Sequence, residues 1–336
     1  MHCPVRPQKC NRLFRKTFEQ VSQIVSLKFE VCDRPIIAFG PRMPGYGSWD
    51  WVGSDIAESL GSRWDVQIFD DEIPACDLVV FVKFKPAANV LRQIASGSAI
   101  IYCPIDFYGS AAEIDADASS LLVCDRVLIH CERLRKYFAP YAAVEYMDHH
   151  VKFSASLRRE FVTRGPLLWV GVRSNLLPLV EFVNANRFPE ELWILTNPED
   201  PTAVPSPAQY GFRSDRPVRI GCWTPERQRE WTSVCRGALD VKARDFRSCH
   251  KPPAKGIDFI ASGVPLAIES NSSTAEHLGR MGLDSATPDD LDRWLSRDYW
   301  DETVRFGAAI GELLSRKRVV RRFERVIEQL LAGRRF

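Results

Sequence analysis

The chain has 336 residues, of which 45% are hydrophobic and 26% are charged, a balance typical of a globular protein with room for two domains. Its net charge of +2 provides no strong global field for nucleic acid, and no apolar run approaches the roughly 20 residues of a membrane span. Charges throughout the first 30 residues argue against a signal peptide, and the ten scattered cysteines, none of them in CxxC spacing, argue against a zinc site or a disulfide framework.

The first predicted element is a helix over residues 9–28, where apolar side chains recur on a helical period and the other face is basic. We interpret it as a helix packed on the surface of a domain. A helix that lies on a membrane or binds a partner is the alternative.

A short buried strand over residues 35–39 runs into a loop rich in glycine and proline, and a helix over residues 54–60 follows. Glycines such as Gly47 let a backbone approach a ligand closely, but the loop does not match GxGxxG, so it is not a dinucleotide fingerprint. Trp49, Asp50 and Trp51 are unusual in a passive connection. We expect a sugar or a base to stack there, and an ordinary long loop is the alternative.

Further strands recur at helix-sized intervals up to residue 146, and each is nearly all apolar, which predicts a parallel sheet covered on both faces. The expected strands are 65–69, 77–82, 99–103, 126–130 and 143–146, and the expected helices between them are 89–95, 111–122 and 132–138.

The same pattern restarts beyond a polar boundary near residues 155–165. The expected strands there are 167–171, 192–196, 218–223, 238–241 and 264–268, with a polar, proline-rich loop over 198–215 and helices from 289 to 336. The predicted fold class is therefore α/β, with two doubly wound Rossmann-like domains facing a cleft. The predicted domains are 1–157 and 158–315, and the C-terminal helix 316–336 is expected to pack back on the first of them.

Residues 249–279 hold the most informative segment. Lys255 and Asp258 are one helical turn apart, ahead of an apolar strand whose end feeds the hydroxyl-rich turn Ser272, Ser273 and Thr274. A strand that leads through such a turn into a helix N-terminus commonly holds an anion. Ordinary N-capping of the helix is the alternative for the three hydroxyls.

Four segments resemble the GT-B-fold glycosyltransferases of the large "glycosyl transferases group 1" type. These are KGIDFIASGVPLAIES, PGYGSWDWVGSDIAESL, CDRVLIHCERLRKYF with VEYMDHHVKF, and WVGVRSN. The chain departs from that pattern in three places, one of which is the absence of the usual Lys-Gly after the glycine-arginine turn. His250 stands where the first acid of the family's E-x7-E pair is usual, with Asp258 at the second, and His150, Val151 and Lys152 replace a Gly-Val-Asp segment.

The resemblance implies that the second domain binds a nucleotide-sugar donor. Lys255 would then bind the diphosphate, Asp258 the ribose hydroxyls, and Ser272, Ser273 and Thr274 the phosphates. Arg173 is a second phosphate candidate, and His250 lies on the donor side. Trp223 would border the base, although a core tryptophan is an equal alternative.

The first domain should then supply the acceptor side, with Gly47, Trp49 and Asp50, and the general base. Asp106 directly follows a predicted parallel strand, at the end where such sheets bind ligands, and it is our first choice; an aspartate that caps a turn is an equal alternative. His149 is the second catalytic candidate; His149 and His150 would point to opposite faces of a strand, so only one could face the site. Carboxylates at a suitable spacing are missing around this pair, so no metal site is predicted.

The predicted function is transfer of a sugar from a nucleotide-diphosphate sugar, with a UDP-sugar as first choice, to a hydroxyl of a sugar, lipid-linked or small-molecule acceptor. We expect no further cofactor and no nucleic-acid partner, and we expect a cytoplasmic protein. The basic terminal helices leave a peripheral contact with the inner membrane face open. A nucleotide-sugar epimerase and an inactive binding protein of the same shape are the alternatives. Sugar, base, acceptor, stereochemical outcome and oligomeric state stay open.

Overall fold

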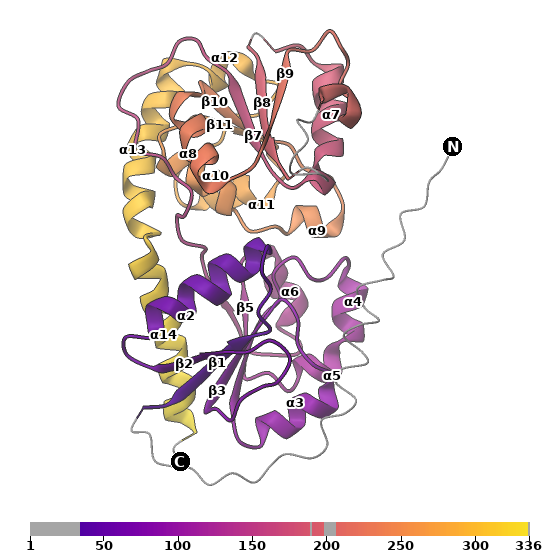
Figure 1. Ribbon diagram of the computed structural model, residues 1–336, viewed down its shortest axis with the longest axis vertical. Coiled ribbons are helices and arrows are strands. Elements are labelled where there is room, and N and C mark those ends of the chain that lie inside the picture. The colour runs from indigo at the N-terminus through magenta and orange to yellow at the C-terminus, as the bar shows by residue number, and fades with distance from the viewer. Residues whose placement is uncertain (1–33, 189, 198–205, 335–336) are drawn as a thin grey trace, which may run out of the picture.

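The computed structural model of the protein describes residues 34–188, 190–197 and 206–334. Within them the chain forms two bodies, each built on a parallel sheet, and one stands above the other in Figure 1. The predicted helix over residues 9–28 and the first part of the predicted loop over 198–215 lie outside the described residues.

The first sheet has six parallel strands in the order β2-β1-β3-β4-β5-β6. Its central strands are buried along their whole length, as their runs of branched and aromatic residues predict. The elements of this domain are β1 (Ile36–Gly40), η2 (Trp49–Ser54), α2 (Asp55–Leu60), β2 (Asp65–Ile68), β3 (Leu78–Val82), α3 (Ala88–Ala95), β4 (Ala99–Cys103), α4 (Ala111–Ala116), α5 (Ala118–Leu121), β5 (Arg126–Ile129), η3 (Glu132–Leu134), α6 (Arg135–Phe138) and β6 (Val144–Tyr146).

Two local predictions for this domain are wrong. Residues 49–54 are not loop but a π-helical turn that runs directly into α2. The helix predicted over 111–122 is divided at Asp117 into α4 and α5. Asp117 leaves helical geometry while its carboxylate accepts hydrogen bonds from Lys85 (2.6 Å) and the Tyr108 hydroxyl (2.5 Å). Tertiary contacts thus override the helical pattern there.

The second sheet has five parallel strands in the order β11-β10-β7-β8-β9. The elements of this domain and of the C-terminal helices are β7 (Leu167–Val170), η4 (Arg173–Asn175), α7 (Leu176–Ala185), β8 (Leu192–Thr196), η5 (Pro207–Tyr210), β9 (Val218–Cys222), α8 (Pro225–Val234), β10 (Gly237–Asp240), α9 (Phe246–Cys249), α10 (Ala254–Ala261), β11 (Leu266–Ile268), α11 (Ser273–Arg280), α12 (Leu291–Trp294), α13 (Arg297–Leu313) and α14 (Arg316–Gly333). The predicted fold class is confirmed: two doubly wound Rossmann-like domains.

Each sheet has one switch point, a pair of neighbouring strands from which the chain proceeds toward opposite edges of the sheet. It lies between β1 and β3 in the first sheet and between β7 and β10 in the second. Ligands of doubly wound sheets bind outside the carboxyl ends of the strands at such points. The loops after β1, β3, β7 and β10 are therefore where a site is expected, with the loop after β4 beside them.

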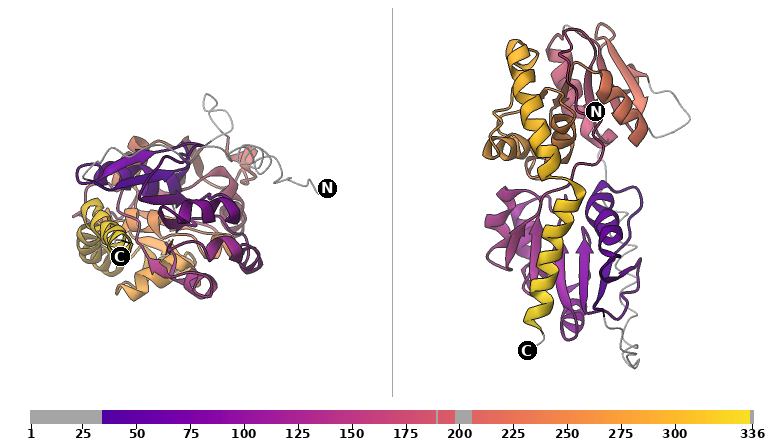
Figure 2. Two further views of the ribbon diagram at one scale, coloured as in Figure 1. Left: turned by 90° about the horizontal axis from the view of Figure 1, so that it is seen from below. Right: turned by 90° about the vertical axis from the view of Figure 1, so that its left-hand side faces the viewer.

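The C-terminal helices join the two domains on one side of the molecule. α13 packs against α10 of the second domain, and α14 then runs down the first domain (Figures 1 and 2). Val319, Phe323 and Ile327 of α14 belong to the core that β1 and β3 also form, and the Phe323 ring lies 5.9 Å from the ring of Phe39. No helix among the described residues is long and apolar enough to cross a membrane.

The connection after β6 is fastened to the second domain and to the junction of α13 and α14. Val151 N–H donates to Leu314 C=O (2.9 Å), and Ala155 N–H donates to the Ser262 hydroxyl (2.9 Å). The chain thus crosses between the domains at two neighbouring places, and both lie beside α10. Movement of one domain relative to the other must deform these crossings.

Gly307 tests the close crossing of α13 and α10. A Cβ at this position would lie 2.1 Å from the Ile260 carbonyl oxygen, which cannot move without its helix. We expect Gly307→Ala to lower the free energy of unfolding by about 1–3 kcal/mol, measured by urea denaturation.

Gly311 is the matched control one turn later in α13, because the nearest atom to its Cβ would be 3.9 Å away. Gly311→Ala should leave stability unchanged or raise it by up to about 1 kcal/mol, since alanine favours helix. Equal effects of the two substitutions would contradict the close crossing.

Candidate functional site

The first domain contributes two residues in an unusual backbone conformation at neighbouring strand ends. Lys83 follows β3 with φ +67°, and Asp106 follows β4 with φ +51°. Non-glycine residues seldom occupy this region, and such strain concentrates at functional sites. The Lys83 ammonium donates to the Asp106 carbonyl (3.4 Å), so the two strained residues meet. Asp106 Oδ1 is buried and has no hydrogen-bond partner.

The second domain contributes lysines at its own switch point. Lys255, on α10, donates from Nζ to the Val170 carbonyl at the end of β7 (2.9 Å). Lys242 follows β10; its Nζ lies 2.9 Å from Asp240 and donates to the Thr274 hydroxyl (3.1 Å). Both ammonium groups therefore lie at the carboxyl edge of the sheet.

These cations lie close enough to perturb one another, across both domains. Burial lowers the pKa of Lys255 to about 8, and the charges of Lys242 and Lys251 add to the decrease. Burial and the charges of Arg247 and Lys251 also lower the pKa of Lys83. Since Lys83 belongs to the first domain and the others to the second, one cation cluster spans the facing strand ends.

Acidic groups neutralise the positive charge of the cluster only in part. Burial alone would raise the pKa of Asp240, but the charges of Lys242, Lys255 and Lys251 outweigh it and hold the pKa low. The charge of Asp106 also acts on Lys83, Lys251 and Lys255. Mutually repelling cations of lowered pKa are stabilised by an anion, so the cluster is suited to a ligand with several negative charges.

A small enclosed space lies directly beside Asp106. It is about as large as one water molecule, and both domains line it, with Asp106 and His130 from the first and His250 and Pro252 from the second. His130 follows β5, the strand next to β4, and sequence reasoning missed it. The rule that selected Asp106, a polar residue directly after a parallel strand, would have selected His130 as well.

His149 packs against His130. The two imidazole rings are 4.4 Å apart, and the other face of His149 stacks on Trp51 at 5.9 Å. Each histidine is only 4% exposed, and their ring nitrogens have no hydrogen-bond partner. Burial lowers the pKa of His130 to about 4 and that of His149 well below its usual value. Both rings are therefore neutral near pH 7.

Asp258 has a different environment from the one the sequence predicts. Its carboxylate faces the connection between the domains, where Oδ1 accepts the backbone N–H of Lys152 (2.8 Å). The residue is 1% exposed, and burial raises its pKa to about 7. Lys255 and Asp258 share α10, but the structure brings only Lys255 to the cation cluster.

The predicted stacking surface in the first domain also needs correction. Trp49 is 4% exposed and packs in the core, because the π-helical turn directs its ring against Gly53. Gly47 is exposed in the preceding loop. Asp50 is half-buried, and its carbonyl accepts a hydrogen bond from the Lys152 ammonium (3.0 Å). A ligand therefore cannot stack on Trp49 in this conformation.

The turn at residues 272–274 confirms N-capping for one of its three hydroxyls, and its predicted phosphate binding stays a prediction. The Ser272 hydroxyl caps α11 by accepting the N–H of Ala275 (3.0 Å). The Ser273 hydroxyl donates to the Lys251 carbonyl (2.6 Å), and Thr274 accepts from Lys242. N-capping thus holds for Ser272, while the next two side chains fasten α11 to the segments that carry the cation cluster.

The remaining candidates lie around the same region. Arg173 is exposed at the start of η4, just beyond β7. Trp223, half-buried after β9, donates its indole N–H to Gln228 (2.7 Å) and meets the Phe153 ring at 5.4 Å. His250 ends α9, with its Nδ1 2.6 Å from the Phe246 carbonyl oxygen. Among the described residues, no three His, Cys, Asp or Glu side chains gather as metal ligands would.

Comparisons with solved structures identify this architecture. A glycosyltransferase involved in avilamycin A biosynthesis, AviGT4, superposes with a TM-score of 0.59 at 17% identity, over 89% of this chain and 98% of that one. The lipopolysaccharide outer core galactosyltransferase WaaB gives 0.58 at 13% identity, over 88% and 99%. The chain has the GT-B fold.

A third similar structure was solved with a bound nucleotide sugar. It is the E. coli trehalose-6-phosphate protein bound with UDP-2-fluoro glucose, with a TM-score of 0.53 at 13% identity over 84% of this chain and 78% of that one. No protein-family model matches the sequence, and no curated protein matches it. The likeness is thus one of fold, as identities of this size imply.

The buried histidine pair predicts a stability that depends on pH. In the unfolded chain His130 takes up a proton near pH 6.5, whereas in the folded protein it does so only near pH 4. The unfolded state therefore binds more protons between these values, and stability should fall by up to roughly 3 kcal/mol as the pH drops from 6.5 to 4. Urea denaturation at pH 7.5 and pH 5 measures the decrease.

His130→Phe should remove the His130 share of this decrease, since phenylalanine keeps a ring but does not titrate, and should leave the share of His149. His250→Asn is the control at a half-buried histidine, where burial lowers the pKa but water still reaches the ring. An unchanged pH dependence in His130→Phe would contradict the interpretation.

Proposed function

We propose that this protein is a glycosyltransferase that moves a sugar from a nucleoside-diphosphate sugar to an acceptor hydroxyl between its two domains. The observation that carries the proposal is the cation cluster at the facing strand ends, formed by Lys83, Lys242, Arg247, Lys251 and Lys255. Likeness to the GT-B structures supports the same chemistry at the level of fold.

The cluster has the charge that the leaving group requires. In glycosyl transfer the bond from the anomeric carbon to the diphosphate breaks, and the departing diphosphate gains negative charge. Cations that already repel one another and lie partly out of water stabilise that charge without reorganising. They would also do what a metal ion does elsewhere, so the proposed reaction is metal-independent.

The donor would bind mainly to the second domain. Lys242, Lys251 and Lys255 would contact the diphosphate, and the N-terminal end of α11 would face it with backbone N–H groups. A UDP-sugar is our first choice, which agrees with the UDP-2-fluoro glucose named for one similar structure. Arg173 and Trp223 stay proposed donor contacts because they follow β7 and β9 of the same sheet.

Asp106 is the proposed general base. Its buried, unpaired Oδ1 borders the small space between the domains, where an acceptor hydroxyl would lie, and its strained backbone holds it beside Lys83. The carboxylate would take the hydroxyl proton as the oxygen attacks the anomeric carbon. His130, neutral and on the same space, would border the acceptor, with His149 packed behind it.

UDP binding tests the donor site. We expect UDP to raise the melting temperature by several degrees at low salt, because it binds the folded state only, and UMP to raise it less. Lys255→Ala should abolish most of the UDP shift. Lys317→Ala, an exposed lysine on α14, is the control that should keep it. No shift with UDP, GDP, TDP or ADP would refute the donor site.

Asp106→Asn separates binding from chemistry. The amide keeps the shape of the side chain but cannot accept the proton, so UDP affinity should change less than threefold while UDP release from a UDP-sugar falls by about 100-fold or more. Release in the absence of any acceptor would favour the epimerase alternative. Binding without turnover in the wild-type protein would favour an inactive binding protein.

A further inference from the structure

An open pocket lies next to the small space at Asp106. Its volume is about 600 Å³, and its lining comes from both domains: Glu132, Arg133, Arg135, Lys136, Tyr137 and His250. His250 also lines the small space, so the pocket and the space beside Asp106 adjoin at this side chain. Both are lined by residues of the two domains.

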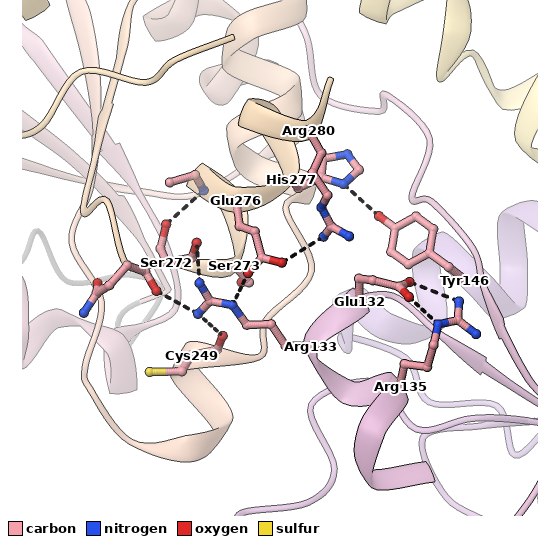
Figure 3. A network of polar contacts seen from close by, with 12 residues as sticks. Glu132, Arg133, Arg135, Tyr146, Cys249, Ser272, Ser273, Glu276, His277 and Arg280 are labelled. Carbon is pink, nitrogen blue, oxygen red and sulfur yellow. Dashed lines mark hydrogen bonds and ion pairs between the residues drawn. The ribbon is translucent and has the colours of Figure 1, made fainter. Parts of the chain in front are cut away.

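Arg133 links the two domains at this pocket. Its guanidinium donates to the Asn271 carbonyl (2.7 Å), to the Ser272 carbonyl (3.3 Å) and to the Glu276 carboxylate, all in the second domain (Figure 3). These contacts occupy Arg133. It therefore shapes the pocket, and other residues must supply the charge for a ligand.

The charge available to a ligand comes chiefly from Lys136. Arg135 is paired with Glu132, as Figure 3 shows, whereas Lys136 is exposed, with its ammonium 4.9 Å from the centre of the Tyr137 ring. Burial lowers the pKa of His250, and the charges of Arg133 and Lys136 lower it further. The inner wall of the pocket is thus a neutral ring in a positive field.

Aromatic rings are the second feature of this pocket, beside the charge of Lys136. Tyr137 meets Phe246 at 5.3 Å and His250 at 5.7 Å, so rings from both domains enclose one side. Sugars pack their C–H faces on aromatic rings, and cations select sugars that carry a negative group. The lysine and the aromatic rings belong to the pocket that shares His250 with the space beside Asp106.

We propose that this pocket selects an acceptor sugar that carries a negatively charged group, a phosphate or a carboxylate, held by Lys136 while its ring lies against Tyr137. The inference rests on the proposed function, because it places the acceptor relative to Asp106. It extends that function by naming the acceptor class.

Equilibrium binding tests the pocket without depending on turnover. Glucose 6-phosphate, glucuronate and glucose are titrated by calorimetry into the full-length protein, with and without UDP. We expect the two anionic sugars to bind at least tenfold more tightly than glucose, and the stronger of the two identifies the charged group. Lys136→Glu should weaken the anionic sugars by at least tenfold and leave UDP binding unchanged. Lys317→Glu is the matched charge reversal on an exposed lysine and should weaken neither.

Each result assigns a separate conclusion. If the wild-type protein does not bind UDP, only the donor site is refuted, because the sugar titrations without UDP do not depend on the donor site. Equal binding of glucose and the anionic sugars, no binding of either anion, or an unaffected Lys136→Glu variant would overturn the acceptor pocket. Binding of inorganic phosphate as tightly as glucose 6-phosphate would also overturn it, since the sugar ring would then contribute nothing.

Discussion

Repulsion among lysines at the facing strand ends is the constraint on which the rest of the site depends. Three of these ammonium groups contact a neutral or acidic neighbour: Lys255 contacts the Val170 carbonyl and the face of Trp169, Lys251 contacts Asn175, and Lys242 contacts Asp240. The carbonyl, amide and aromatic contacts are weaker partners for a cation than a phosphate oxygen is, and the single Asp240 carboxylate faces the charges of three lysines. A diphosphate between the domains would replace them and relieve the repulsion, so ligand binding and domain approach favour each other.

α10 connects this cluster to the crossing between the domains. Lys255 lies on its face toward the cluster, and Asp258, one turn later, holds the backbone of the connecting segment at Lys152. The same segment continues to Lys152 Nζ, which binds Asp55 at the start of α2 in the first domain. A shift of α10 on ligand binding would therefore act directly on the connection that sets how the domains face one another. Gly307 makes this coupling stiff, because α13 packs on α10 without a side chain between them.

Fold class follows from sequence more readily than side-chain direction. Continuous apolar runs such as those of β3, β4 and β8 are buried on both faces, and this pattern is enough to predict two parallel sheets. Asp106 follows from the rule that ligands bind at the carboxyl ends of parallel strands, whereas Lys255 follows from the resemblance of its segment to the donor-binding segment of the family. The surroundings of Asp258 and Trp49 cannot be predicted in this way. A helical period shows which residues share a helix face but not what that face packs against. For Asp258 this depends on the connection between the domains, and for Trp49 it depends on the π-helical turn. His130, at the end of β5, satisfies the same strand-end rule as Asp106, so its place beside Asp106 can be predicted from the sequence.

His250, where the resembled family usually has an acid, decides how the departure from that family is interpreted. Its ring packs on Phe246 and Tyr137, and its Nδ1 lies at the Phe246 carbonyl, so the histidine has a defined structural place. A carboxylate in this position would cancel a positive charge next to Lys136, and a neutral ring leaves that charge available. Loss of the acid therefore increases the attraction of this region for anions. Strained backbone at both Lys83 and Asp106 marks the facing strand ends as a functional region, since such strain persists at active sites and ligand clamps where the surrounding structure holds it. The departure at His250 therefore lies beside this region and changes the charge that a ligand would meet there.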